Sequence, residues 1–203
     1  AVSSNCLNIY TELVGAAPWR PASEGTVGGW AGGRGTMAGM ARVCVLTCSD
    51  SGADGVRADE SGETIVRMLF EAGHTVMRHD IVRDERALIA EHLRVWADSE
   101  LCDVILTTGG TGLTKRDVTP EATRDVAERD VPGIAYALVA NGLQHTPYAA
   151  LTRGIAVTRG AVLIVNLPGS PKAVAQGMDV VLPLLGHVAE LLQGPVEHAQ
   201  ENR

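Results

Sequence analysis

From Arg42 onward, short apolar runs alternate with segments whose apolar residues recur at helical spacing, and this alternation constrains the fold more than any other feature. The first run, Val43–Thr47, ends at the polar cluster Ser49–Gly52. Helical spacing then extends from about Ser61 to Ala72, and Gly73 supplies a stop. A strand is therefore followed by a helix, and the order repeats along the chain.

The later elements continue the pattern. We expect strands over Val76–Val82 and Asp103–Thr108, a helix with Ile89, Leu93 and Trp96 inward, and helices over Pro120–Glu128 and Gly133–Ala140. Ile155–Thr158 and Ala161–Leu167 resemble a hairpin turning at Arg159–Gly160, and a last helix, capped by Ser170, opens at Pro171, breaks at Pro183 and resumes to Leu192. This order predicts an α/β protein with a mostly parallel sheet, helices on both faces and an antiparallel edge.

Composition narrows the class of protein. With 203 residues, of which 45% are hydrophobic, the chain has room for one sizeable core. Its net charge of -7 argues against a general nucleic-acid binder, because a phosphate backbone is held by clustered Lys and Arg. No stretch approaches the roughly 18 consecutive apolar residues of a membrane span. The four cysteines match no metal or redox spacing, which favours buried reduced thiols and a cytoplasmic protein.

The domain boundaries follow from a shift in composition. Residues 1–40 contain many glycines between short polar segments, so we expect a flexible extension. Met37 or Met40 is a candidate for the functional start of the protein. Residues 41–195 form the predicted domain, and residues 196–203 a short tail.

A glycine-rich loop follows the strand that ends at Thr108. Gly109, Gly110 and Gly112 lie within four positions, and Arg116–Asp117 and a helix start at Thr119–Pro120 come next. Glycines let backbone amides approach and bind phosphate oxygens, so an anion site is one interpretation and a tight turn is the other. The loop lacks the full spacing of the standard phosphate motifs.

Four polar or glycine-rich turns follow separate predicted strands, and we expect them to converge. In open α/β sheets the ligand crevice lies outside the carboxyl ends of the strands. The turns contain Ser49–Asp50, Asp84, residues 109–117 and Asn166–Ser170.

Asp84 and Thr119 each have a structural interpretation as helix N-caps. Asp117 has no such explanation, because it precedes the helix by two residues. If both aspartates line the crevice, they imply Mg²⁺, because two carboxylates near phosphates need a cation between them. His145, in an irregular region, is a weaker candidate for a substrate contact.

These residues resemble the signature of the molybdopterin adenylyltransferases, the Mog/MoaB group that includes the gephyrin G domain. The signature matches Thr107–Gly112 followed by Arg116–Thr123. Further matches, in order, are Ser49–Asp50, Asp59-x-Ser61-Gly62, Asp84–Glu85, Glu128-Arg129-x-x-Pro132-Gly133, Thr146–Pro147, Leu151–Arg153 and Asn166–Lys172. The resemblance covers about Arg42 to Gly194.

The resemblance implies a three-layer α/β/α fold, a homotrimer, and transfer of AMP from ATP to molybdopterin. It implies that Asp84 and Asp117 are the essential aspartates, as Mg²⁺ or nucleotide-positioning groups. Nucleotide phosphates would contact Gly109, Gly110, Thr111, Gly112 and Arg116. The ligand rim would be formed by Ser49, Asp50, Asn166, Pro168, Gly169 and Ser170.

Two further expectations follow from the resemblance. No fused second domain like that of gephyrin matches, so a separate protein would insert the metal. The alternative function is a molybdopterin carrier or scaffold of the same fold that transfers no AMP, and a different nucleotide-binding enzyme on the same sheet also stays open.

Overall fold

A computed structural model describes residues 39–194, so the expected extension, except for its last two residues, and the expected tail lie outside the described part. Within this part no helix is both long and apolar enough to cross a membrane. The elements in chain order are β1 (Arg42–Cys48), α2 (Asp50–Ala53), α3 (Glu60–Glu71), β2 (Thr75–Val82), α4 (Arg86–Asp98), β3 (Val104–Thr108), α5 (Thr119–Val126), β4 (Arg129–Asp130), α6 (Pro132–Leu143), the 3-10 helix η1 (Pro147–Leu151), β5 (Ala156–Arg159), β6 (Val162–Leu167) and α7 (Pro171–Gln193).

The six strands form one sheet in the order β2-β1-β3-β6-β5-β4. Pairing is parallel from β2 through β6 and antiparallel between β6, β5 and β4, which confirms the α/β class and the antiparallel edge. The hairpin turns at Gly160, whose φ is +53°. After β1 the chain adds β2 on one side of it and then crosses over to add β3 on the other side. The order in which strands are added therefore reverses at β1 and β3, and such a reversal opens a crevice at the carboxyl ends of the strands.

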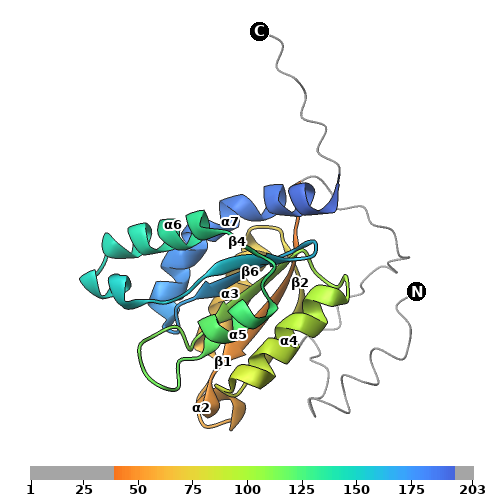
Figure 1. Cartoon of the computed structure of the whole chain (residues 1–203). Helices are drawn as coiled ribbons and strands as arrows, with labels where there is room; N and C mark the ends of the chain where they lie inside the picture. The colour runs from red at the N-terminus through yellow and green to blue at the C-terminus, as the bar shows by residue number, and fades with distance from the viewer. Residues whose placement is uncertain (1–38, 195–203) are drawn as a thin grey trace. The chain divides into compact units, whose positions relative to one another are not determined.

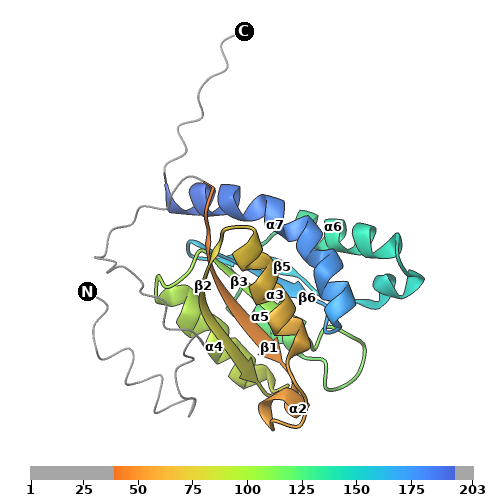
Figure 2. The ribbon, with the colours of Figure 1, turned by 180° about the vertical axis from the view of Figure 1, so that it is seen from behind.

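Helices cover both faces of the sheet (Figures 1 and 2). α4 packs beside α5 on one face, and α3 and α6 pack against α7 on the other, giving three layers. Val43 and Val45 of β1 share a core with Ile65 of α3 and Met178 of α7, while the intervening Cys44 is also fully buried. A central strand that is buried on both faces has apolar residues at successive positions, which explains the continuous apolar run in β1.

Three local features differ from the expectations or add to them. The helix predicted to Glu128 ends at Val126, because Ala127 turns extended and Arg129–Asp130 pairs with β5 as the short strand β4. The polar cluster after β1 contains the short helix α2, capped by Ser49. α7 runs through Pro183 without a break, although Figure 2 shows it changing direction along its length. Proline removes one backbone hydrogen bond, but buried side chains on both sides of Pro183 keep the helix on the sheet.

The cysteines in the described part agree with the expectation of reduced thiols. Cys44, Cys48 and Cys102 are free and buried, and Cys6 lies outside the described residues. Burial raises the pKa of Cys48 to about 12, so its thiol stays neutral.

A buried polar cluster fixes the start of α3. Asp59 caps the helix by accepting from the Gly62 amide at 2.9 Å, and it also accepts from Thr47 Oγ1 at 2.6 Å. His79 Nε2 lies 2.8 Å from the same carboxylate, so this histidine faces inward from β2. The cluster leaves no space for a side chain at position 62, where a Cβ atom would lie 2.2 Å from Asp59 Oδ2.

This cluster predicts loss of stability in acid. Burial acts to raise the pKa of Asp59, but hydrogen bonds from His79, Thr47 and Gly62 outweigh it and lower that pKa. The unfolded carboxyl, with an ordinary pKa of about 3.9, then binds a proton more readily than the folded one. The stabilisation is therefore complete above that pH and is lost as pH falls through the lowered pKa of the folded state.

We expect Asp59→Asn to reduce the free energy of unfolding at neutral pH by about 1–3 kcal/mol. The difference from wild type should stay constant down to about pH 4 and shrink as the pH falls further in urea titrations. Asp130→Asn is the control, because Asp130 is exposed and its ion pair with Arg124 is long, at 3.7 Å. A difference independent of pH would contradict the assignment.

Candidate active site

The turns after β1, β2, β3 and β6 meet at the carboxyl edge of the sheet. The Ser49 amide donates to Val82 O at 2.8 Å, which joins the first two turns. Thr108 Oγ1 donates to Pro168 O at 2.6 Å, which joins the other two, and Gly169 lies against the Cα atom of Gly109. The structure therefore brings together the four segments that the sequence placed after separate strands.

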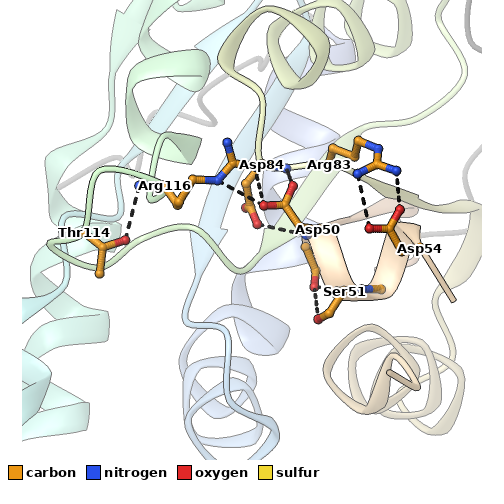
Figure 3. A network of polar contacts seen from close by, with 9 residues as sticks. Asp50, Ser51, Asp54, Arg83, Asp84, Thr114 and Arg116 are labelled. Carbon is orange, nitrogen blue, oxygen red and sulfur yellow. Dashed lines mark hydrogen bonds and ion pairs between the residues drawn. The ribbon is translucent and has the colours of Figure 1, made fainter. Parts of the chain in front are cut away.

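Asp50 and Asp84 exchange hydrogen bonds across this edge (Figure 3). The Asp50 amide donates to Asp84 Oδ2 at 3.0 Å, and the Asp84 amide donates to Asp50 Oδ1 at 3.1 Å. Arg116, from the loop after β3, donates through Nε to Asp50 Oδ2 at 3.0 Å and lowers the pKa of that carboxyl. Two carboxylates are thus held side by side, with one guanidinium beside them.

Asp84 is not the helix cap that its position indicated. α4 begins at Arg86, and Glu85 occupies the cap position without a side-chain bond. Oδ1 of Asp84 is buried and accepts no hydrogen bond from the described residues. Burial, with repulsion from Asp50 and Asp117, raises the pKa of Asp84, and a cation at Oδ1 would stabilise the charged form.

Asp117 is held by the backbone of its own loop. Its Oδ2 accepts from the Thr114 amide at 2.8 Å, and its amide donates to Thr114 O at 3.1 Å. Burial acts to raise the pKa of Asp117, but hydrogen bonds from Thr114 and Gly112 and the charge of Arg153 outweigh it and lower that pKa. Asp117 therefore stays ionised at neutral pH. The cap of the next helix is Val118, so the expectation that Thr119 caps it is wrong.

The glycine loop needs glycine at two positions. Gly109 and Gly110 have φ values of +92° and +62°. A Cβ atom on Gly109 would lie 2.2 Å from Cys48 O, and one on Gly110 would lie 2.3 Å from Thr119 Oγ1 and 3.2 Å from Asp84 Oδ1. The loop backbone therefore packs directly against β1 and the Asp84 carboxylate.

The predicted rim residues differ in what they are free to contact. Asn166 is buried, and its amide group donates to Thr107 Oγ1 at 3.0 Å and Thr123 Oγ1 at 2.9 Å while accepting from the Ile155 amide at 3.2 Å. Its side chain joins β3, β6 and α5 and belongs to the framework of the site. Ser170 caps α7 and lies exposed at the rim beside Gly169.

Two pockets adjoin the loop after β6. The first, of about 80 Å³, lies between the β1 turn, the start of α3 and Gly109, and polar side chains including Ser49 and Asp59 line it. The second, of about 250 Å³, lies between α6, η1 and α7 and is lined mainly by apolar side chains, with Pro168 and Ser170 at its edge. His145 lines neither pocket.

Arg153 is a residue of the site that sequence reasoning did not single out. It follows η1, more than 30 positions after the glycine loop, yet its Nε donates to Gly112 O at 2.6 Å. Its place in the Leu151–Arg153 motif was the available signal, but nothing in that motif indicates which carbonyl groups the guanidinium meets.

We expect Gly109→Ala to destabilise the protein far more than Gly160→Ala. Both glycines have positive φ, which costs an L-residue about 1–2 kcal/mol, but a Cβ atom at position 160 meets nothing within 4 Å. At position 109 it would also displace β1 backbone. Urea unfolding of both variants measures the difference, and equal losses would show that the contact with Cys48 is unimportant.

Comparisons with known proteins show the family of this chain. The sequence profile described as "Probable molybdopterin binding domain" matches residues 44–187. The chain is 38% identical over 154 residues to the molybdopterin adenylyltransferase of Helicobacter pylori strain J99, covering 75% of this chain and 88% of that protein. It is 42% identical over 149 residues to the molybdenum cofactor synthesis protein cinnamon of Drosophila melanogaster, covering 73% of this chain but only 25% of that protein.

A solved structure shows the same fold. The molybdopterin biosynthesis enzyme MoaB from Thermus thermophilus superposes with a TM-score of 0.71 at 47% identity, covering 76% of this chain and 98% of that one. Since the family profile matches most of the chain, this protein belongs to the family of the molybdopterin-binding domain.

Proposed function

We propose that this chain is a molybdopterin adenylyltransferase acting in molybdenum cofactor biosynthesis. The observation that carries the proposal is the convergence of Asp84, Asp117 and the glycine loop at the β1–β3 reversal of the sheet. Relatives of similar length, such as the Helicobacter pylori protein, carry this activity in their names.

In the proposed reaction an oxygen of the terminal phosphate of molybdopterin forms a bond to the α-phosphorus of ATP. The bond from that phosphorus to the bridging oxygen breaks, and pyrophosphate leaves with the electron pair. Both reactants are anions, so the site has to position them and offset their charge. In this scheme backbone amides of Gly109–Thr111 donate to phosphate oxygens, the Gly112 amide stays with Asp117, and Arg116 adds a positive charge at the mouth.

Asp84 and Asp117 fit a magnesium ion shared with the substrates. The described residues contain no cluster of three His, Cys, Asp or Glu side chains able to hold a metal alone. Mg²⁺ usually binds one or two carboxylates together with substrate phosphates and water, and the unpaired Oδ1 of Asp84 is an oxygen suited to it. The ion would supply charge neutralisation for the phosphoryl oxygens.

We expect Asp84→Asn and Asp117→Asn each to lower the rate of AMP transfer by at least about 100-fold. Both variants keep the acceptor oxygen used by the neighbouring amides, so their free energies of unfolding should stay within about 1 kcal/mol of wild type. Asp54→Asn is the control, because Asp54 lies at the same edge but is paired with Arg83 (Figure 3).

The measurement is chromatographic detection of adenylylated molybdopterin after incubation with ATP, Mg²⁺ and molybdopterin. Product from wild type and Asp54→Asn, but not from the other two, supports the transferase. Saturable molybdopterin binding without product would favour the carrier or scaffold function. ATP binding that molybdopterin does not affect would favour a different nucleotide-binding enzyme.

The trimer implied by the family resemblance is supported by an apolar helix with few contacts. α6 consists almost entirely of apolar and small residues, yet only Ile134 is buried. Tyr136 and Tyr148, on α6 and η1, are 73% and 76% exposed. A helix that is apolar on every side is normally covered, so we propose that α6 and η1 form the contact between copies of the chain.

The double variant Tyr136→Ser/Tyr148→Ser should dissociate this assembly. Light scattering should give wild type three times the 21.3 kDa mass of the chain and the double variant the mass of one chain. Phe70→Ser is the control, since Phe70 is 79% exposed on α3, away from α6. A monomeric wild type would contradict the trimer, and a trimeric double variant would place the contact elsewhere.

The proposed product carries no metal. A separate metal-insertion protein would therefore receive adenylylated molybdopterin, and we place both proteins in the cytoplasm with ATP.

A further inference from the structure

Arg153 binds the glycine loop at three points between Thr111 and Asp117. Its amide donates to Thr111 O at 2.9 Å, its Nε to Gly112 O at 2.6 Å and its Nη2 to Asp117 O at 2.5 Å. Nη1 pairs with Glu121 in the first turn of α5. One residue from the segment after η1 therefore fixes the loop from its glycines to the following helix.

The loop has little other support on its outer side. Residues 113–116 are exposed, and the hydrogen bonds of Thr114 stay within the loop. The ion pair of Arg116 with Asp50 has a guanidinium that is 61% exposed, and solvent screens such pairs. Arg153, whose side chain is only 33% exposed, is better shielded.

The guanidinium contacts of Arg153 fix the orientation of two peptide groups of the loop. In a trans peptide the C=O and the following N–H point in opposite directions. Because Nε holds the Gly112 carbonyl and Nη2 holds the Asp117 carbonyl, the amides of Leu113 and Val118 face away from Arg153. The second of these peptide groups belongs to the residue that carries the carboxylate. The carboxylate lies 3.0 Å from the position of a Cβ atom on Gly112.

From this geometry we infer that Arg153 is a positioning residue, which places the Asp117 carboxylate by orienting the peptide groups of the glycine loop. The inference rests on the proposed function for its effect on the rate of transfer, but its effect on Asp117 does not depend on that function. Arg153 touches no reacting atom in this scheme. Its role requires a planar fork of donors, which lysine lacks despite carrying the same charge.

Arg153→Lys is the decisive variant, because it keeps the charge and removes the fork. Arg159→Lys is its matched control. Arg159 also makes a forked pair, with Asp98 at 2.8 Å through both Nε and Nη2, and donates to the Val126 carbonyl, but it lies on the hairpin outside the site.

The first measurement uses the full chain with ATP, Mg²⁺ and molybdopterin. We expect Arg153→Lys to lower kcat by about 10- to 100-fold with KM for ATP changed by less than about twofold, because misplacing a catalytic group acts on the reacting geometry. Arg159→Lys should keep the wild-type kcat. Millimolar guanidinium should restore part of the activity of Arg153→Ala. A kcat within about twofold of wild type for Arg153→Lys would overturn the inference.

The second measurement needs no activity. Amide hydrogen exchange followed by NMR should be faster in Arg153→Lys than in wild type at Thr114, whose amide donates to the Asp117 carboxylate, because the loop is no longer held at Gly112 and Asp117. Exchange at Thr114 should be unchanged in Arg159→Lys. If wild type forms no adenylylated molybdopterin, the proposed function fails and this exchange measurement alone decides the inference. An unchanged exchange rate at Thr114 in Arg153→Lys would overturn it.

Discussion

The reciprocal hydrogen bonds between Asp50 and Asp84 are the interaction on which the site depends. They join the turns after β1 and β2, so the carboxylate of Asp84 is fixed relative to the sheet. The same bonds hold two like charges together, which the protein offsets only in part with the exposed Arg116. Burial and the neighbouring carboxylates accordingly raise the pKa of Asp84, and the proposed cation would stabilise its charged form.

Topology explains why the sequence predicted the fold so well. Strands β1, β3 and β6 have apolar runs long enough to be recognised, and parallel strands between helices have few alternative arrangements. β4 escaped prediction because its two residues, Arg129 and Asp130, are exposed and become a strand only by pairing with β5. The continuity of α7 through Pro183 likewise depends on burial of side chains on both sides, which local propensity does not include.

The site was predicted less completely, for a related reason. Turns after parallel strands necessarily meet at one edge, so the grouping of Asp50, Asp84 and the glycine loop followed from element order alone. The direction of each side chain did not. Asn166 also lies at this edge by its position in the chain. Its side chain turns inward, however, and its amide group donates to Thr107 and Thr123. Whether a polar side chain at this edge points to a ligand or into the protein is decided by its contacts with residues that are distant in sequence.

Arg153 shows the same dependence at the level of a single loop. The glycines that let the backbone approach a phosphate also leave it without side chains to hold it, since the neighbouring residues 113–116 are exposed. The loop therefore needs contacts from another segment of the chain. A half-buried guanidinium that reaches the carbonyl groups of Gly112 and Asp117 is well suited to hold it, because its donors are rigidly spaced. Freedom of the glycine backbone and restraint by Arg153 are thus complementary, and the catalytic geometry that we propose depends on both.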